Sequence, residues 1–277
     1  MTVFPENKLD EAMLGRLINS LRPPSAVVMR LMRALQSEDI SHDEVEECVN
    51  EDPLLAIEAI KLANTANNGG RLKVDSISEA LSIIGYMELV RLCLRYSFFK
   101  LVPKRLHSYG LDADAYYRKS QVCAKAMDYL GGGTEKAGSH YYTIGLLHSI
   151  GEMIIDRYLV LNGLEHNVFE GIRLRPLALV ESNLVGYNQA EIAGRILRSW
   201  KFDESIVRPI EGQFDLIVEH EYKDAAVALS TARYLTELIL EEDAGGSSSS
   251  SKTSHMVYKG KSLCRLVDFI REDLNVG

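Results

Sequence analysis

The chain has 277 residues, with 31 Lys and Arg against 39 Asp and Glu and a formal net charge of -8. Its 46% hydrophobic and 25% charged residues are ordinary values for a folded globular protein, which excludes the disordered and fibrous classes. The acidic balance, without a block of Lys and Arg, argues against a primary nucleic-acid binder, because phosphate contacts need a concentrated basic surface.

Targeting to a membrane or to the secretory pathway is not expected. The longest uncharged run, residues 137–151, is shorter than the ~20 apolar residues that a bilayer-spanning helix needs. The first twenty residues carry several charges and no apolar segment of the kind found in signal peptides. We therefore expect a cytoplasmic protein without membrane contact.

The four cysteines do not form a metal or redox motif. Cys48, Cys93, Cys123 and Cys264 are widely spaced, and no C-x-x-C pair occurs. Reduced, buried thiols are the expectation, and neither a metal nor another cofactor is predicted.

Apolar residues recur at helical spacing along nearly the whole chain, which predicts an all-α fold. The clearest sets are Leu14, Leu17, Ile18 and Leu21, then Val28, Leu31, Met32 and Leu35, then Ala80, Ile83, Ile84 and Met87. Helix starts are marked by pairs in which a capping residue precedes an acid by three positions. These pairs are Ser41 with Glu44, Ser76 with Glu79 and Asn188 with Glu191. Asp52 before Pro53 predicts a further helix start. Sustained alternation of period two is missing, so no more than a stray hairpin is expected.

Breaks in the pattern predict how the chain is organised. Val102-Pro103 closes a block of short helices, and Gly131-Gly132-Gly133 ends a helix predicted from about Asp112 to Leu130. We expect an N-terminal helical subdomain at residues 1–102, packed on a second helical subdomain at residues 103–240.

The C-terminal part has a different composition. Residues 241–260 contain five consecutive serines and two glycines and are predicted to be a flexible linker. Residues 261–277 are predicted to form a last amphipathic helix. Its apolar face, which must dock on the body or on another chain, consists of Leu263, Leu266, Val267 and Ile270.

Five motifs in fixed order mark the first part of the chain. They are Leu21-Arg-Pro-Pro-Ser, Glu51-Asp-Pro-Leu-Leu, Lys61-Leu-Ala-Asn-Thr-Ala-Asn, Val74-Asp-Ser-Ile-Ser-Glu-Ala and Ile83-Ile84-Gly85. In order and spacing they closely resemble the N-terminal half of HDOD domains. Some motif residues have a clear structural role. Asp52 can cap a helix that Pro53 begins, and Asn64 can hydrogen-bond to exposed carbonyls at a helix end.

The resemblance continues to about residue 235. It is carried by Tyr117-Arg-Lys-Ser, Ile144-Gly-Leu-Leu-His-Ser-Ile-Gly-Glu, Glu181-Ser-Asn-Leu-Val-Gly-Tyr-Asn-Gln-Ala-Glu and Leu197-Arg-Ser-Trp. In HDOD proteins this half is a degenerate HD-like helical bundle. The related HD phosphohydrolases hold metal with a His, an adjacent His-Asp pair and a final Asp.

This sequence departs from that pattern at most ligand positions. The resemblance places Lys119, His148, Ser149 and Thr231 where the metal ligands of HD phosphohydrolases lie. Asn188 and Gln213 stand where the pattern more often carries His. A hydrolytic metal needs several imidazole or carboxylate ligands, and Lys and Ser supply neither. The sequence therefore predicts no metal and no catalytic residue, with His148 as a hydrogen-bonded core residue.

The resemblance and the lost ligands together suggest a function. The leading hypothesis is a non-catalytic HDOD-type regulatory module of bacterial signal transduction that acts by binding signalling proteins. One alternative is a metal-dependent HD-type phosphohydrolase of nucleotides or cyclic dinucleotides. Another is a binder of a phosphate-bearing second messenger, such as a nucleotide, that does not hydrolyse it.

Two groups of residues are candidate binding sites. Lys119 places a positive charge in the former metal site and could attract a phosphate with help from neighbouring polar groups, or it could pair with Glu152 or Asp156. Basic residues near the predicted subdomain junction form a candidate interaction seam, with a solvated helix face as the equal alternative. They are Arg91, Arg95, Lys100, Lys104 and Arg105.

Overall fold

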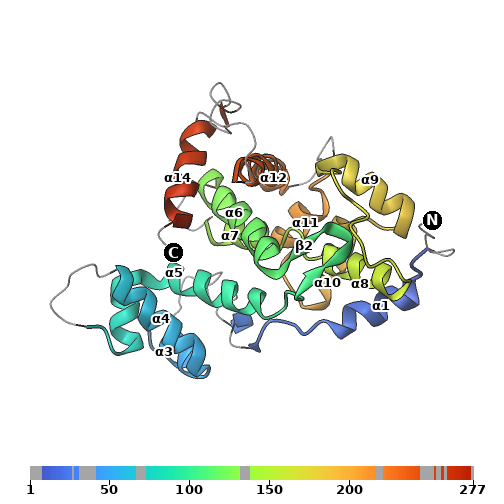
Figure 1. Ribbon diagram of the computed structural model, residues 1–277. Helices are drawn as coiled ribbons and strands as arrows, with labels where there is room; N and C mark the ends of the chain where they lie inside the picture. Colours follow the sequence, from blue (N-terminus) through green and yellow to red (C-terminus); the bar gives the residue numbers. More distant parts are fainter. Residues whose placement is uncertain are drawn as a thin grey trace. The chain divides into compact units, whose positions relative to one another are not determined.

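The protein is all-α, as predicted (Figure 1). The computed structural model describes residues 8–26, 28–30, 42–66, 73–131, 138–215, 221–243, 253, 257–258 and 261–275. The strands in this part of the chain are two short antiparallel pairs, β1 (Arg105–Leu106) with β2 (Leu111–Asp112), and β3 (Val257–Tyr258) with β4 (Lys261–Ser262). The chain divides into two compact units. The small unit is Pro23–Leu101, and the large unit is Met1–Arg22 with Val102–Gly277.

The small unit contains α3 (His42–Asn50), α4 (Pro53–Ala66) and α5 (Ile77–Phe99), which pack on one another. Pro53 begins α4 as predicted, with Asp52 Oδ1 accepting hydrogen bonds from the backbone N–H groups of Leu54 and Leu55. Ser76 caps α5 by accepting from the N–H of Glu79.

Two motif residues of the small unit have clear structural roles. Asn64 joins the end of α4 to the segment before α5, donating to the carbonyls of Ile60 and Val74 at 2.9 and 2.8 Å and accepting from Val74 N–H at 3.0 Å. Gly85 interrupts α5 with φ of 75°, a conformation that favours glycine because it lacks Cβ. The motifs thus fix the path of the backbone in this unit.

The large unit holds the remaining helices. They are α1 (Glu11–Ser20), the short helix η1 (His107–Tyr109), α6 (Ala113–Leu130), α7 (Gly138–Leu147), α8 (Glu152–Leu161), α9 (Leu174–Val185), α10 (Gln189–Ser199), α11 (Glu204–Glu211), α12 (Lys223–Asp243) and α14 (Leu263–Asn275). At its centre α6 packs against α7 and α12, and their buried side chains form the core. Asp112 caps α6, which ends at Leu130 before Gly131, as predicted.

The N-terminal segment belongs to the large unit, whereas the sequence analysis placed residues 1–102 together. Leu9 N–H donates to the Val185 carbonyl at 2.9 Å, and Glu11 pairs with Arg195. Helix α1 also buries Leu14 and Leu17 and contacts α8. These contacts are non-local, which explains why local sequence patterns did not reveal them. The division after Leu101 agrees with the break at Val102-Pro103.

The C-terminal helix α14 packs on the large unit through its predicted apolar face, since Leu263, Leu266, Val267 and Ile270 are buried. It contacts α6, with the rings of Tyr129 and Phe269 5.8 Å apart. The predicted linker, 241–260, begins within α12, which extends to Asp243. Residues 244–252, 254–256 and 259–260 of this linker lie outside the described residues, as does the predicted cap Ser41.

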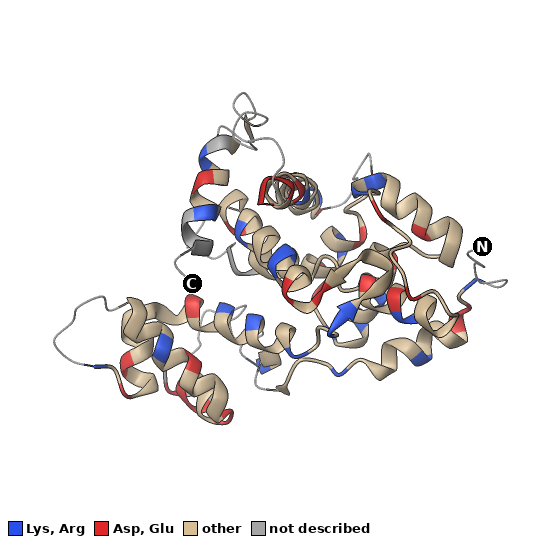
Figure 2. Ribbon diagram, viewed as in Figure 1, with Lys and Arg blue, Asp and Glu red and all other residues tan. Residues whose placement is uncertain are grey.

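Charged residues of both signs are distributed along the helices of each unit (Figure 2). Within the described ranges, none of the helices has the length and apolar character that crossing a bilayer requires.

Candidate functional site

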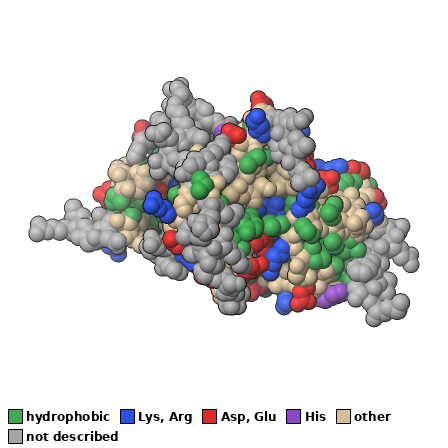
Figure 3. All heavy atoms as spheres, turned by 90° about the horizontal axis from the view of Figure 1, so that it is seen from above, with side chains coloured by type: hydrophobic (Ala, Val, Ile, Leu, Met, Phe, Trp, Pro, Cys, Tyr) green, Lys and Arg blue, Asp and Glu red, His purple; other side chains and the backbone are tan. Residues whose placement is uncertain are grey.

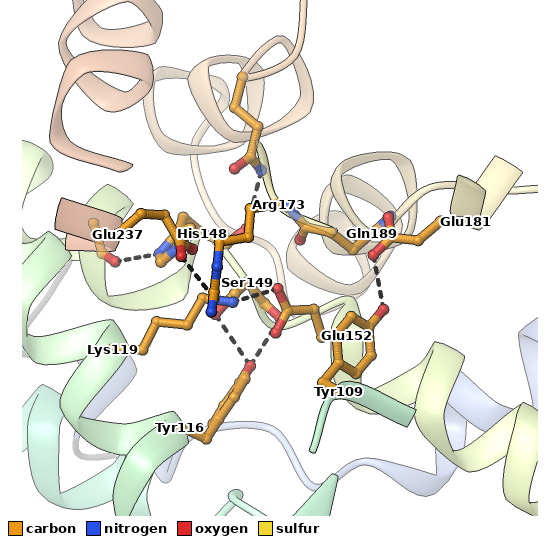
Figure 4. A network of polar contacts seen from close by, with 12 residues as sticks. Tyr109, Tyr116, Lys119, His148, Ser149, Glu152, Arg173, Glu181, Gln189 and Glu237 are labelled. Atoms are coloured by element: carbon orange, nitrogen blue, oxygen red, sulfur yellow. Dashed lines mark hydrogen bonds and ion pairs between the residues drawn. The ribbon is translucent and has the colours of Figure 1, made fainter. Parts of the chain in front are cut away.

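The turn between α7 and α8 forms the centre of a buried polar cluster in the large unit. Residues 148–151 make this turn and bring His148 and Ser149 beside Lys119, which lies on α6 (Figure 4). Gly151 is required here, because a Cβ at this position would meet the carbonyl oxygen of Gln189 at 2.0 Å. The turn therefore packs directly on the start of α10.

Lys119 forms a buried ion pair with Glu152, one of the two acids named as candidate partners from the sequence. Lys119 Nζ lies 2.6 Å from Glu152 Oε1, and the two side chains are 13% and 3% exposed. Burial raises the pKa of the Glu152 carboxyl, while Lys119 opposes that rise. The lysine is thus held in the interior.

His148 is a buried, hydrogen-bonded core residue. Its Nδ1–H donates to the Gly145 carbonyl, with 2.8 Å between the two atoms. Burial, followed by the positive charges of Lys119 and Arg233, holds the pKa of His148 well below its usual range. Gln213 Nε2 donates to the His148 carbonyl at 3.0 Å and joins the cluster. At neutral pH His148 is therefore uncharged and fixed in orientation.

Ser149 contacts an aromatic residue and not a metal-binding group. The hydroxyl of Tyr116, itself fully buried, donates to the Ser149 carbonyl at 2.8 Å, and Ser149 Oγ lies 3.3 Å from the same hydroxyl. The Ser149 side chain is also fully buried. It contributes a hydroxyl where an HD site would require a carboxylate.

A second buried carboxyl group completes one side of the cluster. Glu181 Oε1 accepts from the Tyr109 hydroxyl and its Oε2 accepts from Gln189 N–H, each at 2.8 Å (Figure 4). Burial raises the pKa of Glu181 to about 8. Glu181 was not predicted as a site residue. It opens one of the family motifs, but nothing in the sequence indicates that its side chain is buried.

Arg233 is a further member of the cluster that the sequence analysis missed. It is buried, its guanidinium lies 4.1 Å from the centroid of the Phe214 ring, and Nη1 is 3.4 Å from the Gln213 carbonyl. On the same helix, α12, Thr231 bonds back to the Val227 carbonyl at 3.0 Å and is outside the cluster. Thr231, a predicted site residue, is therefore not part of the cluster. Arg233, two positions further along α12, is buried in the cluster instead.

Asn188 is also outside the cluster. Its Oδ1 accepts hydrogen bonds from the N–H groups of Ala190 and Glu191, and Glu191 bonds back to Asn188 N–H, which makes a complete capping box at the start of α10. The neighbouring Gln189 is the buried residue that faces Glu181. This capping role agrees with the sequence pattern. The two cap hydrogen bonds occupy Asn188 Oδ1, the oxygen with which Asn188 could have bound a ligand.

Cys123 of α6 is buried near the same cluster, and burial raises the pKa of its thiol to about 12. A thiol with that pKa carries almost no thiolate at neutral pH, so it is unreactive. Cys93, in the small unit, is also a free, buried thiol.

The predicted interaction seam draws on both units. In the small unit, Arg91 and Arg95 pair with Glu88 at 3.4 and 3.3 Å, and Lys100 lies 3.4 Å from Asp52. These ion pairs neutralise much of the positive charge of Arg91, Arg95 and Lys100 within the small unit.

The two remaining seam residues, Lys104 and Arg105, belong to the large unit and are exposed. They are therefore the seam residues most available to a partner.

The residues of the cluster do not fit a hydrolytic metal ion. Lys119 and Arg233 bring two positive charges into the cluster, and Glu152 is already paired with Lys119. Throughout the part of the chain that the structure describes, no three His, Cys, Asp or Glu side chains come together as a metal site. A hydrolytic metal ion needs several imidazole and carboxylate ligands, and the cluster lacks such a set.

A pocket of about 310 Å³ opens beside Lys119. Its wall includes Tyr109 and Phe169, whose ring centroids are 4.8 Å apart, and its charged residues include Arg173 and Glu237. Arg173 Nη1 lies 2.9 Å from Glu237 Oε2. The pocket therefore connects the surface to the edge of the buried cluster.

The fold defines an all-α protein with an HD-like helical bundle, and the bundle holds the buried polar cluster. The HDOD domain model matches residues 21–215. The chain belongs to the HDOD family.

Several solved structures share this fold. A provisionally named phosphohydrolase from Shewanella amazonensis SB2B is 23% identical, with a TM-score of 0.64, and the match covers 94% of this chain and 88% of that one. A provisionally named signal transduction protein from Marinobacter aquaeolei VT8 is 18% identical, with a TM-score of 0.67 and coverage of 99% and 61%. An HDOD domain protein of unknown function from Geobacter sulfurreducens is 17% identical, with a TM-score of 0.64 and coverage of 96% and 95%.

An uncharacterised protein of Treponema pallidum (strain Nichols) is 22% identical over 236 residues, which are 82% of this chain. The match spans 45% of the length of that relative.

Proposed function

We propose that this chain is a non-catalytic signalling module of the HDOD family that acts by binding other proteins. The observation that carries the proposal is the buried ion pair between Glu152 and Lys119, the residue that the family resemblance places at a metal-ligand position of HD phosphohydrolases. An ammonium group cannot act as a metal ligand while it is protonated, and it cannot activate water as a bound metal does.

The electrostatics around this pair support the same proposal. Arg233 adds a second positive charge, and His148 is the single imidazole of the cluster, where a hydrolytic metal needs several ligands. Removing the ligands while keeping the helical core preserves a scaffold and its surfaces, and a fold alone does not imply the chemistry of its relatives.

The competing function is metal-dependent phosphohydrolysis. The test is to incubate the purified full chain with phosphomonoesters, nucleotides and cyclic dinucleotides in the presence of Mn²⁺, Mg²⁺, Fe²⁺ or Zn²⁺, beside an HD phosphohydrolase that has its full ligand set. We expect no hydrolysis above the buffer blank. Metal-dependent turnover that disappears in His148→Ala would contradict the proposal.

The binding of protein partners is tested separately. Lys104 and Arg105 are exposed, and reversing both to Glu should reduce the capture of a native signalling partner without changing the circular dichroism spectrum. The double reversal Arg175→Glu with Lys223→Glu, at exposed positions of α9 and α12, is the matched control. Equal capture by both variants would place the partner elsewhere on the surface.

A further inference from the structure

We propose that the pocket beside Lys119, which we call the α9 pocket, binds a nucleoside monophosphate or a ligand built from one. This inference rests on the proposed non-catalytic function only in that the ligand is bound and not cleaved. The α9 pocket lies entirely within the large unit, and its lining includes residues from η1, α6, α9 and α12.

The size and the walls of the α9 pocket suit a small aromatic ligand. Its volume of about 310 Å³ is at the lower end of the usual range for small-molecule sites, about the size of one nucleotide. Tyr109 and Phe169 form an aromatic wall, and Leu111, Ile172 and Leu240 add apolar surface. Figure 3, which views the protein from the side of α9 and α12, shows apolar side chains exposed between basic and acidic ones on this face.

The cationic residues of the pocket suit a phosphate. Lys119 and Arg173 both line it. Guanidinium groups bind phosphate oxygens through paired hydrogen bonds. A phosphate at Arg173 would therefore meet a matched pair of donors, with the charge of Lys119 in the same lining.

Arg173 is available for this role in a way that Lys119 is not. The Arg173 side chain is 53% exposed, whereas that of Glu237 is 16% exposed. Arg173 Nη1 contacts Glu237, and the guanidinium carries further N–H donors that can meet a phosphate from the solvent side. Lys119 stays paired with the buried Glu152 and contributes its charge from the inner end of the pocket.

The acidic residues of the pocket explain why the ligand should carry more than a phosphate. Besides Glu237, which is paired with Arg173, Glu170 lines the α9 pocket together with the amide of Asn167. The Glu170 carboxylate repels a free phosphate, but it can accept hydrogen bonds from the amino and imino groups of a nucleobase. A ligand with a planar, donor-bearing end and an anionic end matches both the acidic and the basic residues.

The experiment is isothermal titration calorimetry of the full chain with GMP, AMP, CMP and UMP, with the nucleosides guanosine and adenosine, and with inorganic phosphate. We expect at least one nucleotide to bind about tenfold or more tightly than its nucleoside and than phosphate. The absence of heat with every nucleotide, or equal affinity for phosphate alone, would overturn the proposal.

Three variants test the assignment of residues. Arg173→Met should weaken nucleotide binding about tenfold or more, whereas Arg175→Met, which removes the same charge outside the pocket, should leave it unchanged. Glu237→Gln removes the competing partner of Arg173 and should tighten binding. Equal weakening by Arg173→Met and Arg175→Met, or weaker binding by Glu237→Gln, would overturn the assignment.

Failure of the proposed function is read from the ligand itself. Phosphorus NMR of the titrated nucleotide should show it intact after the experiment. Binding accompanied by loss of the phosphate would support the α9 pocket and contradict the non-catalytic function.

Discussion

The small unit and the large unit differ in what their interiors contain. Among the described residues, the buried side chains of the small unit are apolar, whereas all the buried polar and charged side chains belong to the large unit. Burying a charged group is costly unless it is paired, so these groups lower the stability that an apolar core would provide. The small unit shows that the chain can build an apolar interior, and the polar interior of the large unit marks its candidate site.

The largest expected effect comes from removing one member of the buried pair. Lys119→Met leaves Glu152 buried without its partner, and we expect a loss of about 3–5 kcal/mol in the free energy of unfolding. Urea unfolding followed by the fluorescence of Trp200, the single tryptophan, reports on the large unit directly.

The control for this experiment is the double variant Lys119→Met with Glu152→Gln. It removes both charges and should recover most of the lost stability. A loss below about 1 kcal/mol for Lys119→Met alone would mean that the pair behaves as a surface ion pair.

A smaller effect is expected from a polar residue of the small unit. Asn64→Ala removes three hydrogen bonds, two that join α4 to Val74 and one to the Ile60 carbonyl within α4, and at a net ~0.5–1.5 kcal/mol per bond we expect a loss of about 2–3 kcal/mol. Circular dichroism in urea measures the change. Thr65→Ala, which removes a single bond to the Lys61 carbonyl at an exposed neighbouring position, is the control. Equal losses for the two variants would show that Asn64 does not organise the unit.

The smallest expected effect is a pH dependence that only the large unit can produce. The Glu181 carboxyl has a pKa of about 8 in the folded protein against an ordinary value of 4.5. The folded state therefore holds this proton more tightly than the unfolded state, and the stabilisation is lost as the pH rises toward 8. His148, with its lowered pKa, has the opposite effect below its ordinary value of 6.5.

The effect of Glu181 is therefore best measured between pH 6.5 and 8.5. This range starts at the ordinary pKa of His148 and includes the raised pKa of Glu181. In this window the wild type should lose about 2 kcal/mol that Glu181→Gln does not lose. Urea unfolding at several pH values gives both slopes. Parallel slopes for the two proteins would show that Glu181 is not the titrating group.

Local patterns predicted the fold well because helix caps and apolar periodicity are local properties. The caps at Ser76, Asn188 and Asp52 and the end of the helix at Leu130 are where the sequence placed them. The placement of α1 was not predictable in the same way, because it depends on contacts with residues more than 150 positions away, such as Arg195.

The candidate site was predicted in part. Lys119, His148, Ser149 and Gln213 lie in the buried cluster, and they were found through the spacing of family motifs. Glu181 and Arg233 were not predicted as site residues because Glu and Arg are usually exposed. Only the packed structure reveals that these two side chains are buried.

We propose that the buried Lys119–Glu152 ion pair stands in place of the metal of an HD site, and the metal content of the protein tests this directly. The full chain should be incubated with Mn²⁺, Fe²⁺, Ni²⁺ and Zn²⁺, desalted and analysed by plasma mass spectrometry. We expect only traces of each metal, equal in the wild type and in His148→Ala. Stoichiometric metal in the wild type that is lost in His148→Ala would contradict it.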